Sequence, residues 1–361
     1  MVYNVIGTMS GSSIDGLDIV YCTLQEIGGK WSYQINVSDC IEFPEVWQQK
    51  LKHITEATAK DLLLTHAAFG HWMANAIKDF INQHQLEHKV HLIASHGHTV
   101  FHDPANHMTF QMGDGAAIAT INRLPVVSDL RNMDVALGGE GAPIVPIGEK
   151  LLWHEYTYFL NIGGISNITI ARESTHIAFD VCPANKVLNL LSNELGKSYD
   201  DQGMSASKGL INEDLLFELN DLDYYKKSYP KSLANEFGSV VLFGIIQKYS
   251  ISTEDKLCTL CEHIAMQINA VCNEANQLSP EKMLITGGGA NNDYLVSRIK
   301  HFLAQKNIEI DIPHPDLIAY KEALIMALIG VLRWREEINV LHTVTGASRS
   351  SIGGALWMGQ D

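Results

Sequence analysis

The sequence lacks long hydrophobic runs and clusters of basic residues. No stretch approaches the roughly 18 consecutive apolar residues of a membrane span, and the longest apolar segment, 323–332, lies inside an amphipathic pattern. Lys and Arg number 26 against 41 Asp and Glu, so the formal net charge is −15. Proteins that bind nucleic acids or anionic membranes carry basic faces, and we therefore expect neither partner. An acidic protein can still bind a small phosphorylated ligand through backbone N–H groups and a cation.

Cysteine is sparse and scattered, which indicates reduced core thiols rather than a disulfide framework. The Cys258-Thr-Leu-Cys261 pair has no second pair to complete a zinc site, and it falls on a helical pattern that favours core packing. The N-terminus has no basic segment followed by an apolar leader, so we expect an immediate β-strand and a cytoplasmic protein. The six cysteines are Cys22, Cys40, Cys182, Cys258, Cys261 and Cys272.

The length of 361 residues indicates two globular domains. Each half opens with two strand patterns joined by a turn of small residues, at 2–6 with 17–24 and at 156–161 with 167–171. This repetition predicts two similar α/β domains facing one another across a cleft. Further strands are expected at 91–94, 109–112, 125–128, 176–181, 283–286 and 308–312, and helices at 45–54, 60–84, 116–122, 185–195, 211–220, 232–249, 255–277, 319–337 and from 292 onward.

Three glycine-rich segments predict a nucleotide site. The first, Gly7–Asp18, offers N–H and O–H donors to phosphate oxygens, and Asp15 or Asp18 could hold a hydrated Mg²⁺. It lacks the Gly-Lys-Ser/Thr of a Walker A loop and does not pass directly into a helix. A decorated hairpin turn is the alternative for this segment alone. Its recurrence as Asn161–Asn167, and again as Thr286–Ala290, favours a nucleotide-binding cleft.

Asp129, at the end of a predicted strand, is a candidate general base because a strand end holds a carboxylate rigidly against water or a hydroxyl. A cap on the following turn, or an ion pair with Arg131, explains it equally well. His96, His98 and His102 lack the carboxylate or thiol that would complete a zinc spacing. Hydrogen bonds to a polyhydroxylated ligand and structural packing both remain open for them. No Gly-x-Ser-x-Gly elbow is present.

The order of these segments along nearly the whole chain resembles the anhydro-N-acetylmuramic acid kinase family. That family belongs to the superfold of actin, sugar kinases and heat-shock ATPases. The resemblance implies an α/β fold with two similar actin-like ATPase (ribonuclease H-like) domains flanking a nucleotide and sugar cleft. We place them at residues 1–130 with 341–361, and at 131–340. The matching segments are Gly7–Asp18, Ser95–Thr99, Gln111–Asp114, Asp129–Arg131, Gly138–Pro143, Asn161–Asn167, Phe179-Asp180, Gly287–Gly289 and Lys321–Ala323.

The resemblance also implies an activity. Water opens the 1,6-anhydro bridge of 1,6-anhydro-N-acetylmuramic acid while O6 receives the γ-phosphoryl of ATP, giving N-acetylmuramic acid 6-phosphate and ADP in cell-wall recycling. The implied cofactors are ATP and Mg²⁺, and the implied assembly is a homodimer. The family's catalytic aspartate falls on Asp129, which takes a proton from the water attacking C1.

The remaining site residues are carried over from the family's motifs. The first phosphate loop is Gly11, Ser12, Ser13, Ile14, Asp15, Gly16, Leu17 and Asp18; the second is Gly163 and Gly164; the adenosine segment is Gly287, Gly288 and Gly289. The candidates for sugar contacts are His96, Thr99, Arg131 and Glu322, and those for holding the metal through water are Asp15 and Asp180.

This chain departs from the family pattern at three places. Ser12 stands where a Thr is common and keeps the hydroxyl, and His98 stands where Gln is common. Val181-Cys182-Pro183-Ala184 replaces a usual Thr-Gly-Pro-Gly, and because Cys and Ala disfavour a positive φ this loop is expected to differ. Two alternatives therefore stay open: a hexosamine kinase of the same superfold that acts on a free hydroxyl, and a non-catalytic nucleotide-dependent scaffold or sensor.

Overall fold

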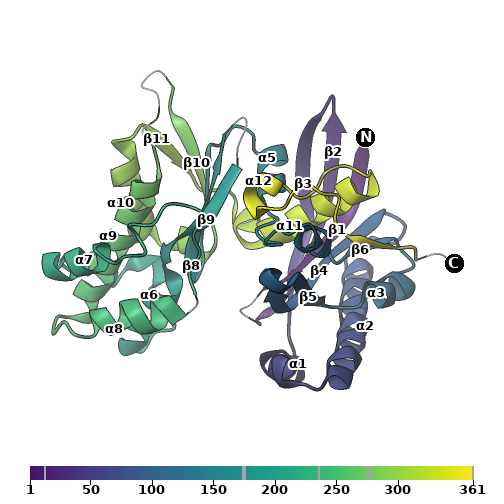
Figure 1. Ribbon diagram of the computed structural model, residues 1–361, viewed down its shortest axis with the longest axis horizontal. Helices are drawn as coiled ribbons and strands as arrows, with labels where there is room; N and C mark the ends of the chain where they lie inside the picture. The colour runs from purple at the N-terminus through teal and green to yellow at the C-terminus, as the bar shows by residue number, and fades with distance from the viewer. Residues whose placement is uncertain (12–13, 173–175, 235, 274, 276–278, 360–361) are drawn as a thin grey trace. The chain divides into compact units, whose positions relative to one another are not determined.

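The computed structural model describes residues 1–11, 14–172, 176–234, 236–273, 275 and 279–359 (Figure 1). The chain forms two compact units, residues 1–154 with 320–361 and residues 155–319. It passes from one unit to the other later than the 130/131 boundary expected from sequence, and returns earlier than the 340/341 boundary. A buried Glu149–Lys321 ion pair joins helix α5 (Pro146–Leu152) to helix α11 (Pro315–Trp334) inside the first unit, which extends that unit to both helices.

The first unit is built on a mixed sheet in the order β12-β6-β4-β1-β2-β3, with β5 paired to β4. β1 is antiparallel to β2, and β2 to β3, whereas β4 is parallel to both β1 and β6. The strands are β1 (Val2–Ser10), β2 (Gly16–Ile27), β3 (Lys30–Glu42), β4 (Leu92–Asp103), β5 (Met108–Met112), β6 (Val126–Ser128) and β12 (Ala355–Trp357).

Helices cover both faces of this sheet. On one face, Phe69 and Met73 of α2 pack with Ile6 of β1 in a fully buried cluster. On the other face, α11 approaches β1 so closely that a Cβ on Gly7 would lie 2.8 Å from the backbone nitrogen of Ala327. The helices are α1 (Glu45–His53), α2 (Ala59–Gln83), α3 (Gly115–Asn122), α4 (Asn132–Ala136), α5 (Pro146–Leu152), α11 (Pro315–Trp334) and α12 (His342–Thr345), and the first residues of α11 fall in the second unit.

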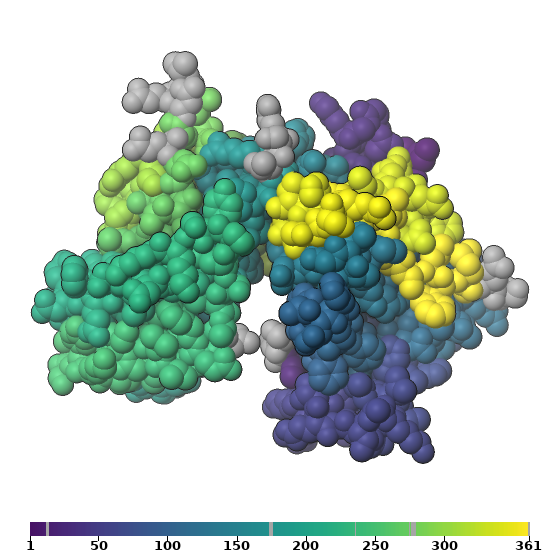
Figure 2. All heavy atoms as spheres, in the orientation of Figure 1, coloured from purple at the N-terminus to yellow at the C-terminus, as the bar shows by residue number. Residues whose placement is uncertain are grey.

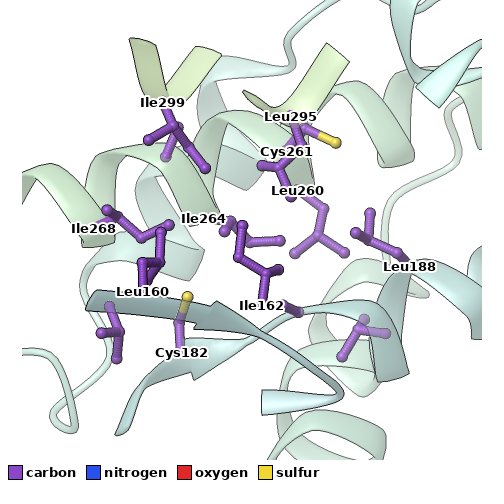
Figure 3. Close-up of a cluster of buried hydrophobic side chains, with 14 of the residues drawn as sticks. Leu160, Ile162, Cys182, Leu188, Leu260, Cys261, Ile264, Ile268, Leu295 and Ile299 are labelled. Atoms are coloured by element: carbon purple, nitrogen blue, oxygen red, sulfur yellow. The ribbon is translucent and has the colours of Figure 1, made fainter. Parts of the chain in front are cut away.

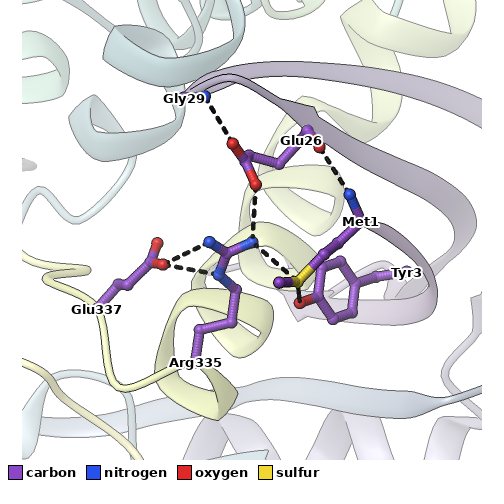
Figure 4. Close-up of polar contacts among 6 residues, drawn as sticks. All are labelled: Met1, Tyr3, Glu26, Gly29, Arg335 and Glu337. Carbon is purple, nitrogen blue, oxygen red and sulfur yellow. Dashed lines mark hydrogen bonds and ion pairs between the residues drawn. The ribbon is translucent and has the colours of Figure 1, made fainter.

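Segments from the two ends of the chain meet in the first unit. Arg335, just after α11, pairs with Glu26 of β2 at 3.3 Å and with Glu337 at 2.6 Å (Figure 4). The C-terminal segment then lies against residues of the same unit, as the yellow surface in Figure 2 shows, and Glu140 N–H donates to the carbonyl of Thr345. The C-terminal residues therefore belong to the first unit.

The second unit has a five-stranded sheet in the order β11-β10-β7-β8-β9. Helices α6, α9 and α10 bury a hydrophobic cluster against it, including Leu160, Ile264 and Ile299 (Figure 3). Its strands are β7 (Tyr158–Ile162), β8 (Ile165–Ala171), β9 (His176–Pro183), β10 (Glu281–Thr286) and β11 (Ile308–Asp311). Its helices are α6 (Asn185–Glu194), α7 (Glu213–Asn220), α8 (Phe243–Ile246), α9 (Thr253–Val271) and α10 (Asp293–Ala304).

The two units repeat one topology. In each, three successive strands form an antiparallel meander, and two later strands add in parallel beside the first of them, giving β3-β2-β1-β4-β6 and β9-β8-β7-β10-β11. This is the strand order of a ribonuclease H-like domain. The predicted α/β fold with two similar actin-like domains is confirmed.

Several local predictions were wrong. The sequence analysis missed β3, whose alternation of exposed and half-buried residues gives a weak hydrophobic signal. The helix expected at 232–249 begins as a π-helical turn, Phe237–Leu242, and becomes α-helical only in α8. Cys40 is exposed, whereas the other five cysteines are buried.

Among the described residues, no helix is both long and apolar enough to cross a membrane.

Candidate active site

The first glycine-rich segment forms the tip of the β1–β2 hairpin. Ser12 and Ser13 lie outside the described residues. Ile14, which follows them, has a left-handed backbone with φ +56° and donates its N–H to the carbonyl of Gly11, which precedes them, at 3.4 Å. The side chain of Asp15 accepts the N–H of Gly16 at 3.0 Å. A Cβ on Gly16 would lie 2.7 Å from the sulfur of Cys40, so this tight turn requires glycine there.

Leu17 and Asp18 point to opposite faces of β2, as adjacent strand residues do. Leu17 is fully buried in the hydrophobic core, which leaves only its backbone to face a nucleotide. Burial raises the pKa of Asp18 to about 6; the negative charges of Asp15 and Glu322 add to this rise, and a hydrogen bond from Cys40 opposes it. The negative charges of Asp15 and Glu322 thus both act on Asp18, and this excess negative charge suits a bound cation.

His96, Arg131 and Glu322 come together in the first unit. The Nε of Arg131 donates to Nε2 of His96 at 2.8 Å, and its Nη1 donates to the carbonyl of Gly141 at 3.1 Å. Burial and the positive charge of Arg131 lower the pKa of His96 to about 3, so the imidazole is neutral. Burial also lowers the pKa of Arg131, and the negative charge of Glu322 partly offsets this decrease. Thr99 is exposed further along β4, at 3.5 Å from the side chain of Gln111.

Asp129 follows the last residue of β6 and has a left-handed backbone, with φ +57°. Such a conformation is strained for a non-glycine residue and persists where the surrounding structure enforces it, often at functional sites. The hydroxyl of Ser128 donates to Oδ2 of Asp129 at 2.6 Å. Among the described residues, Oδ1 of Asp129 has no hydrogen-bond partner, so this oxygen remains available to a ligand.

Asp134 organises the neighbouring glycine-rich loop, and sequence reasoning missed it. It is fully buried, and its carboxylate accepts the N–H of Gly141 at 2.8 Å and the hydroxyl of Thr345 at 2.7 Å. Since the carbonyl of Gly141 holds Arg131, Asp134 fixes the guanidinium indirectly. The signal in the sequence was an isolated acidic residue in a short apolar turn just before Gly138-Gly139.

The second and third glycine-rich segments lie side by side in the second unit. The carbonyl of Gly163 accepts the N–H of Asn185, the first residue of α6, at 3.0 Å. Gly287, with φ +80°, leaves β10 beside the end of the parallel strand β7. A Cβ on Gly287 would lie 2.8 Å from the carbonyl oxygen of Ile162. The second and third glycine-rich segments therefore contact each other at the ends of β7 and β10.

Asp180 lies on β9 of the second unit, under the segment 224–233. Its carboxylate accepts the N–H of Leu233 at 2.9 Å, and its carbonyl accepts the hydroxyl of Tyr224 at 2.7 Å. Burial raises the pKa of Asp180, and the hydrogen bond from Leu233 partly offsets this increase. The ammonium of Lys231 lies 4.7 Å from the centre of the Tyr224 ring. Asp15 and Asp180, the two metal candidates, thus belong to different units.

The residues that depart from the family pattern are accommodated without a left-handed backbone. Cys182 lies within β9, fully buried, and burial raises the pKa of its thiol to about 12. Ala184, the residue before α6, has φ −132° and donates its N–H to the carbonyl of Gly164 at 2.9 Å. The loop is therefore built here with Cys182 in β9 and Ala184 in a negative-φ conformation.

The side chains available as metal ligands limit how a metal ion would bind. Within the part of the chain that the structure describes, no three His, Cys, Asp or Glu side chains converge into a direct metal site. The negative charges of Asp15 and Glu322 act on Asp18, but these three carboxylates do not form such a cluster among the described residues. This arrangement fits a Mg²⁺ ion that is held mainly by phosphate oxygens and water, as the ion prefers.

Comparisons with known proteins identify the family. The sequence model described as anhydro-N-acetylmuramic acid kinase matches residues 3–359. The chain is 32% identical to the anhydro-N-acetylmuramic acid kinase of Clostridioides difficile (strain 630), with 97% of each chain covered, and 32% identical to that of Vibrio vulnificus (strain CMCP6), with 98% and 97% covered.

Among solved structures, the chain is similar to component A of the (R)-2-hydroxyglutaryl-CoA dehydratase of Acidaminococcus fermentans. The identity is 14% and the TM-score 0.45, over 91% of this chain and 97% of the other. It is also similar to the activator of the 2-hydroxyisocaproyl-CoA dehydratase of Clostridium difficile with bound ADPNP, at 15% identity and a TM-score of 0.42, over 93% and 96%. By the match along nearly its whole length to the sequence family, this chain belongs to the anhydro-N-acetylmuramic acid kinases.

Proposed function

We propose that this protein is an ATP-dependent kinase that opens the 1,6-anhydro ring of 1,6-anhydro-N-acetylmuramic acid and phosphorylates O6. The products are N-acetylmuramic acid 6-phosphate and ADP, and the reaction serves peptidoglycan recycling. Family membership supports the overall reaction. The observation that carries the assignment to a site is the strained Asp129, with one carboxylate oxygen fixed and the other available, in the same unit as His96, Arg131 and Glu322.

Asp129 acts as the general base. Its Oδ1 takes a proton from water as the water oxygen bonds to C1 of the sugar, and the bond from C1 to O6 breaks. The released O6 attacks the γ-phosphorus of ATP, and the bond from that phosphorus to the bridging oxygen of ADP breaks. The strain of the bicyclic sugar lowers the barrier to ring opening, so the protein contributes mainly alignment and charge compensation.

The sugar contacts are His96, Thr99, Arg131 and Glu322. A neutral His96 that accepts the Arg131 N–H through Nε2 carries its own proton on Nδ1, toward the carbonyl of Gly97. Its ring is therefore fixed in one tautomer and supports the guanidinium. The Arg131 guanidinium and the Glu322 carboxylate then present a donor group and an acceptor group to the sugar hydroxyls.

The nucleotide is bound mainly by backbone groups. The hairpin residues Gly11–Asp18 and the turn Gly163-Gly164 contact phosphates, and Gly287–Gly289 contact the adenosine. This division gives the first domain the first phosphate loop and the sugar contacts, and the second domain the other two segments. Asp15 and Asp180 would hold Mg²⁺ through water, and the ion, when bound, neutralises charge on the phosphates.

The partners follow from the reaction and the charge. The ligands are ATP and the anhydro amino sugar; we expect no nucleic-acid or membrane partner, since the net charge is −15 and the sequence has no basic run. A cytoplasmic location suits an enzyme that uses ATP, and a homodimer is the assembly that the family resemblance implies.

The test is an assay of the purified protein with ATP, Mg²⁺ and the anhydro sugar, with products identified by mass spectrometry. We expect N-acetylmuramic acid 6-phosphate and an equal amount of ADP. Parallel reactions with free N-acetylmuramic acid and N-acetylglucosamine test phosphorylation of a free hydroxyl. Faster turnover of either free sugar, or no sugar phosphate beside an active control kinase, would contradict the proposal.

A further inference from the structure

We infer that Ser128 and Trp357 are positioning residues that hold Asp129 through a directed chain of two hydrogen bonds. The indole Nε1–H of Trp357 donates to the hydroxyl of Ser128 at 3.0 Å, and that hydroxyl donates to Oδ2 of Asp129 at 2.6 Å. The inference rests on the proposed function, because the role of Asp129 as the base comes from it. It gives the C-terminal strand a part in the reaction.

The direction of the chain follows from the chemistry of its members. An indole N–H can donate and cannot accept, so the Ser128 oxygen is the acceptor of the first bond. The single hydroxyl proton of Ser128 is then left for Asp129, whose ionised carboxylate can only accept. A hydroxyl donating to a carboxylate makes a short, strong bond, which agrees with the 2.6 Å separation.

The sheet register explains why a residue near the C-terminus reaches the end of β6. β12 pairs antiparallel with β6, with Trp357 opposite Val126 and Ala355 opposite Ser128. Trp357 and Ser128 are therefore diagonal neighbours on the sheet, a separation that a long aromatic side chain can span. Ser128 is 3% exposed, whereas Trp357 is 39% exposed, so the indole covers the buried hydroxyl from the solvent side.

Gly115, the first residue of α3, leaves the space for this bond. A Cβ at that position would lie 2.5 Å from the Ser128 oxygen and 2.6 Å from the Trp357 nitrogen, closer than non-bonded atoms approach. Strands β6 and β12 and helix α3 therefore meet at this hydrogen bond.

The arrangement assigns different tasks to the two carboxylate oxygens of Asp129. Oδ2 is fixed by the hydrogen bond from Ser128, which prevents rotation of the carboxylate. Oδ1 keeps the orientation that proton transfer from water requires. Loss of the Ser128 hydroxyl would therefore slow the proton-transfer step and leave nucleotide binding intact.

The kinetic arm uses Ser128→Ala and Trp357→Phe. We expect Ser128→Ala to lower kcat about 10-fold, to leave the KM for ATP unchanged, and to change the acid limb of the pH–rate profile, because the Asp129 carboxylate loses its fixed hydrogen bond. Trp357→Phe should act in the same direction, less strongly. The controls are Ser351→Ala, at a 5% exposed serine whose hydroxyl has no partner among the described residues, and Trp334→Phe, at a 43% exposed tryptophan.

The second arm does not need turnover. The indole N–H resonance of Trp357, among six tryptophans, is identified by its loss in Trp357→Phe and is followed by NMR as the pH is lowered. Other titratable or charged groups lie on the packed elements: Asp114 and Arg123 at the ends of α3, His96, His98, His102 and Asp103 on β4, Arg131 and Asp134 at α4, and Arg333, which donates to the carbonyl of Gly354. Asp129→Asn leaves all of these side chains in place, so it isolates the contribution of Asp129.

We expect the Trp357 resonance to shift with pH in the wild-type protein, and the shift to disappear in Asp129→Asn and in Ser128→Ala. A resonance that titrates equally in Asp129→Asn would overturn the inference even if the enzyme is active. A wild-type protein that shows the coupled titration but does not turn over the anhydro sugar would refute the proposed function and leave the hydrogen-bond chain established. An unchanged pH–rate profile in an active Ser128→Ala would also overturn it.

Discussion

Asp129 carries the chemistry of the proposed reaction, and its environment explains how. The backbone at φ +57° turns the side chain at the end of β6, and Ser128 holds one oxygen. Replacement by Asn keeps the shape and removes the base. We therefore predict that Asp129→Asn lowers kcat at least ~100-fold, the usual contribution of a general base.

Nucleotide binding separates this loss from misfolding. Asp129→Asn should bind ATP with wild-type affinity in calorimetry, because within the described residues the Asp129 side chain is held by Ser128 and not by a glycine-rich segment proposed to bind the nucleotide. A turnover rate within about twofold of the wild type would refute the assignment of the base.

Asp18 predicts a pH dependence of stability. Its pKa rises from 3.8 in the unfolded chain to about 6 in the folded protein, mainly through burial. Between these values the folded state binds the proton more tightly, so the free energy of unfolding falls as the pH rises through this window. Asp18→Asn removes that loss. The variant should be about 1 kcal/mol more stable than wild type at pH 7.5, after allowance for solvent screening, with no gain at pH 3.5.

Urea unfolding without nucleotide or Mg²⁺ measures this difference. The matched control is Asp223→Asn, whose side chain is 98% exposed and which should change stability by less than about 0.5 kcal/mol at either pH. An Asp18→Asn variant that is less stable than wild type at pH 7.5 would show that the carboxylate is favourably paired.

At the scale of elements, α5 and α11 are joined by the buried ion pair between Glu149 and Lys321, at 3.1 Å, with side chains 3% and 7% exposed. Lys321 precedes Glu322, so the pair also fixes the turn of α11 that carries a proposed sugar contact. Lys321→Met leaves a buried carboxylate uncompensated, and we predict a loss of about 3–5 kcal/mol in denaturant unfolding.

The double variant Glu149→Leu, Lys321→Met removes both charges. It should recover most of the lost stability, because a buried ion pair is often replaceable by apolar residues. A single variant as stable as wild type would contradict the ion pair, and a double variant no more stable than the single one would show that packing, not charge, is the cause.

Glycine at the end of β10 predicts a specific loss of nucleotide binding. Gly287 and Gly29 have similar backbones, φ +80° and +82°, but a Cβ meets nothing within 4 Å at Gly29 and meets Ile162 and Asn161 at Gly287. Both alanine variants should lose about 1 kcal/mol of stability through backbone strain. Gly287→Ala alone should also weaken ATP binding, at least about 10-fold in Kd, since its neighbours must shift.

Gly29→Ala is the control, because it introduces the same backbone strain without a steric clash of the added Cβ. Equal ATP affinities in the two variants, measured by calorimetry, would show that the adenosine segment does not depend on this close approach.

For the whole molecule, the sequence predicts the repeated architecture well. Glycine-rich turns between strands mark both hairpins, and strong apolar periodicity marks the long helices. The sequence does not reveal β3, because its residues alternate between exposed and half-buried without a strong apolar pattern. The two compact units divide the chain at other residues than the expected boundaries. The Glu149–Lys321 contact in the first unit spans 172 residues of sequence, and local sequence patterns carry no trace of it.

The candidate site also contains residues that a local sequence motif reveals and residues that only the tertiary structure reveals. Asp129, Arg131 and the three glycine-rich segments are visible in sequence because each has a local motif. Asp134 and Trp357 act through residues that are distant in the chain, Thr345 and Ser128, and only the tertiary structure brings these pairs together. Positioning residues of this kind therefore need the structure to be recognised.

In the proposed mechanism water opens the anhydro ring and O6 is then phosphorylated. Labelling of the water with an oxygen isotope tests this coupling most directly. The protein is incubated with ATP, Mg²⁺ and 1,6-anhydro-N-acetylmuramic acid in water enriched in heavy oxygen, and the product is fragmented by mass spectrometry. The mechanism predicts one heavy oxygen atom at C1 of N-acetylmuramic acid 6-phosphate and none on the phosphate. A sugar phosphate that keeps the anhydro bridge, or heavy oxygen found on the phosphate rather than at C1, would contradict it.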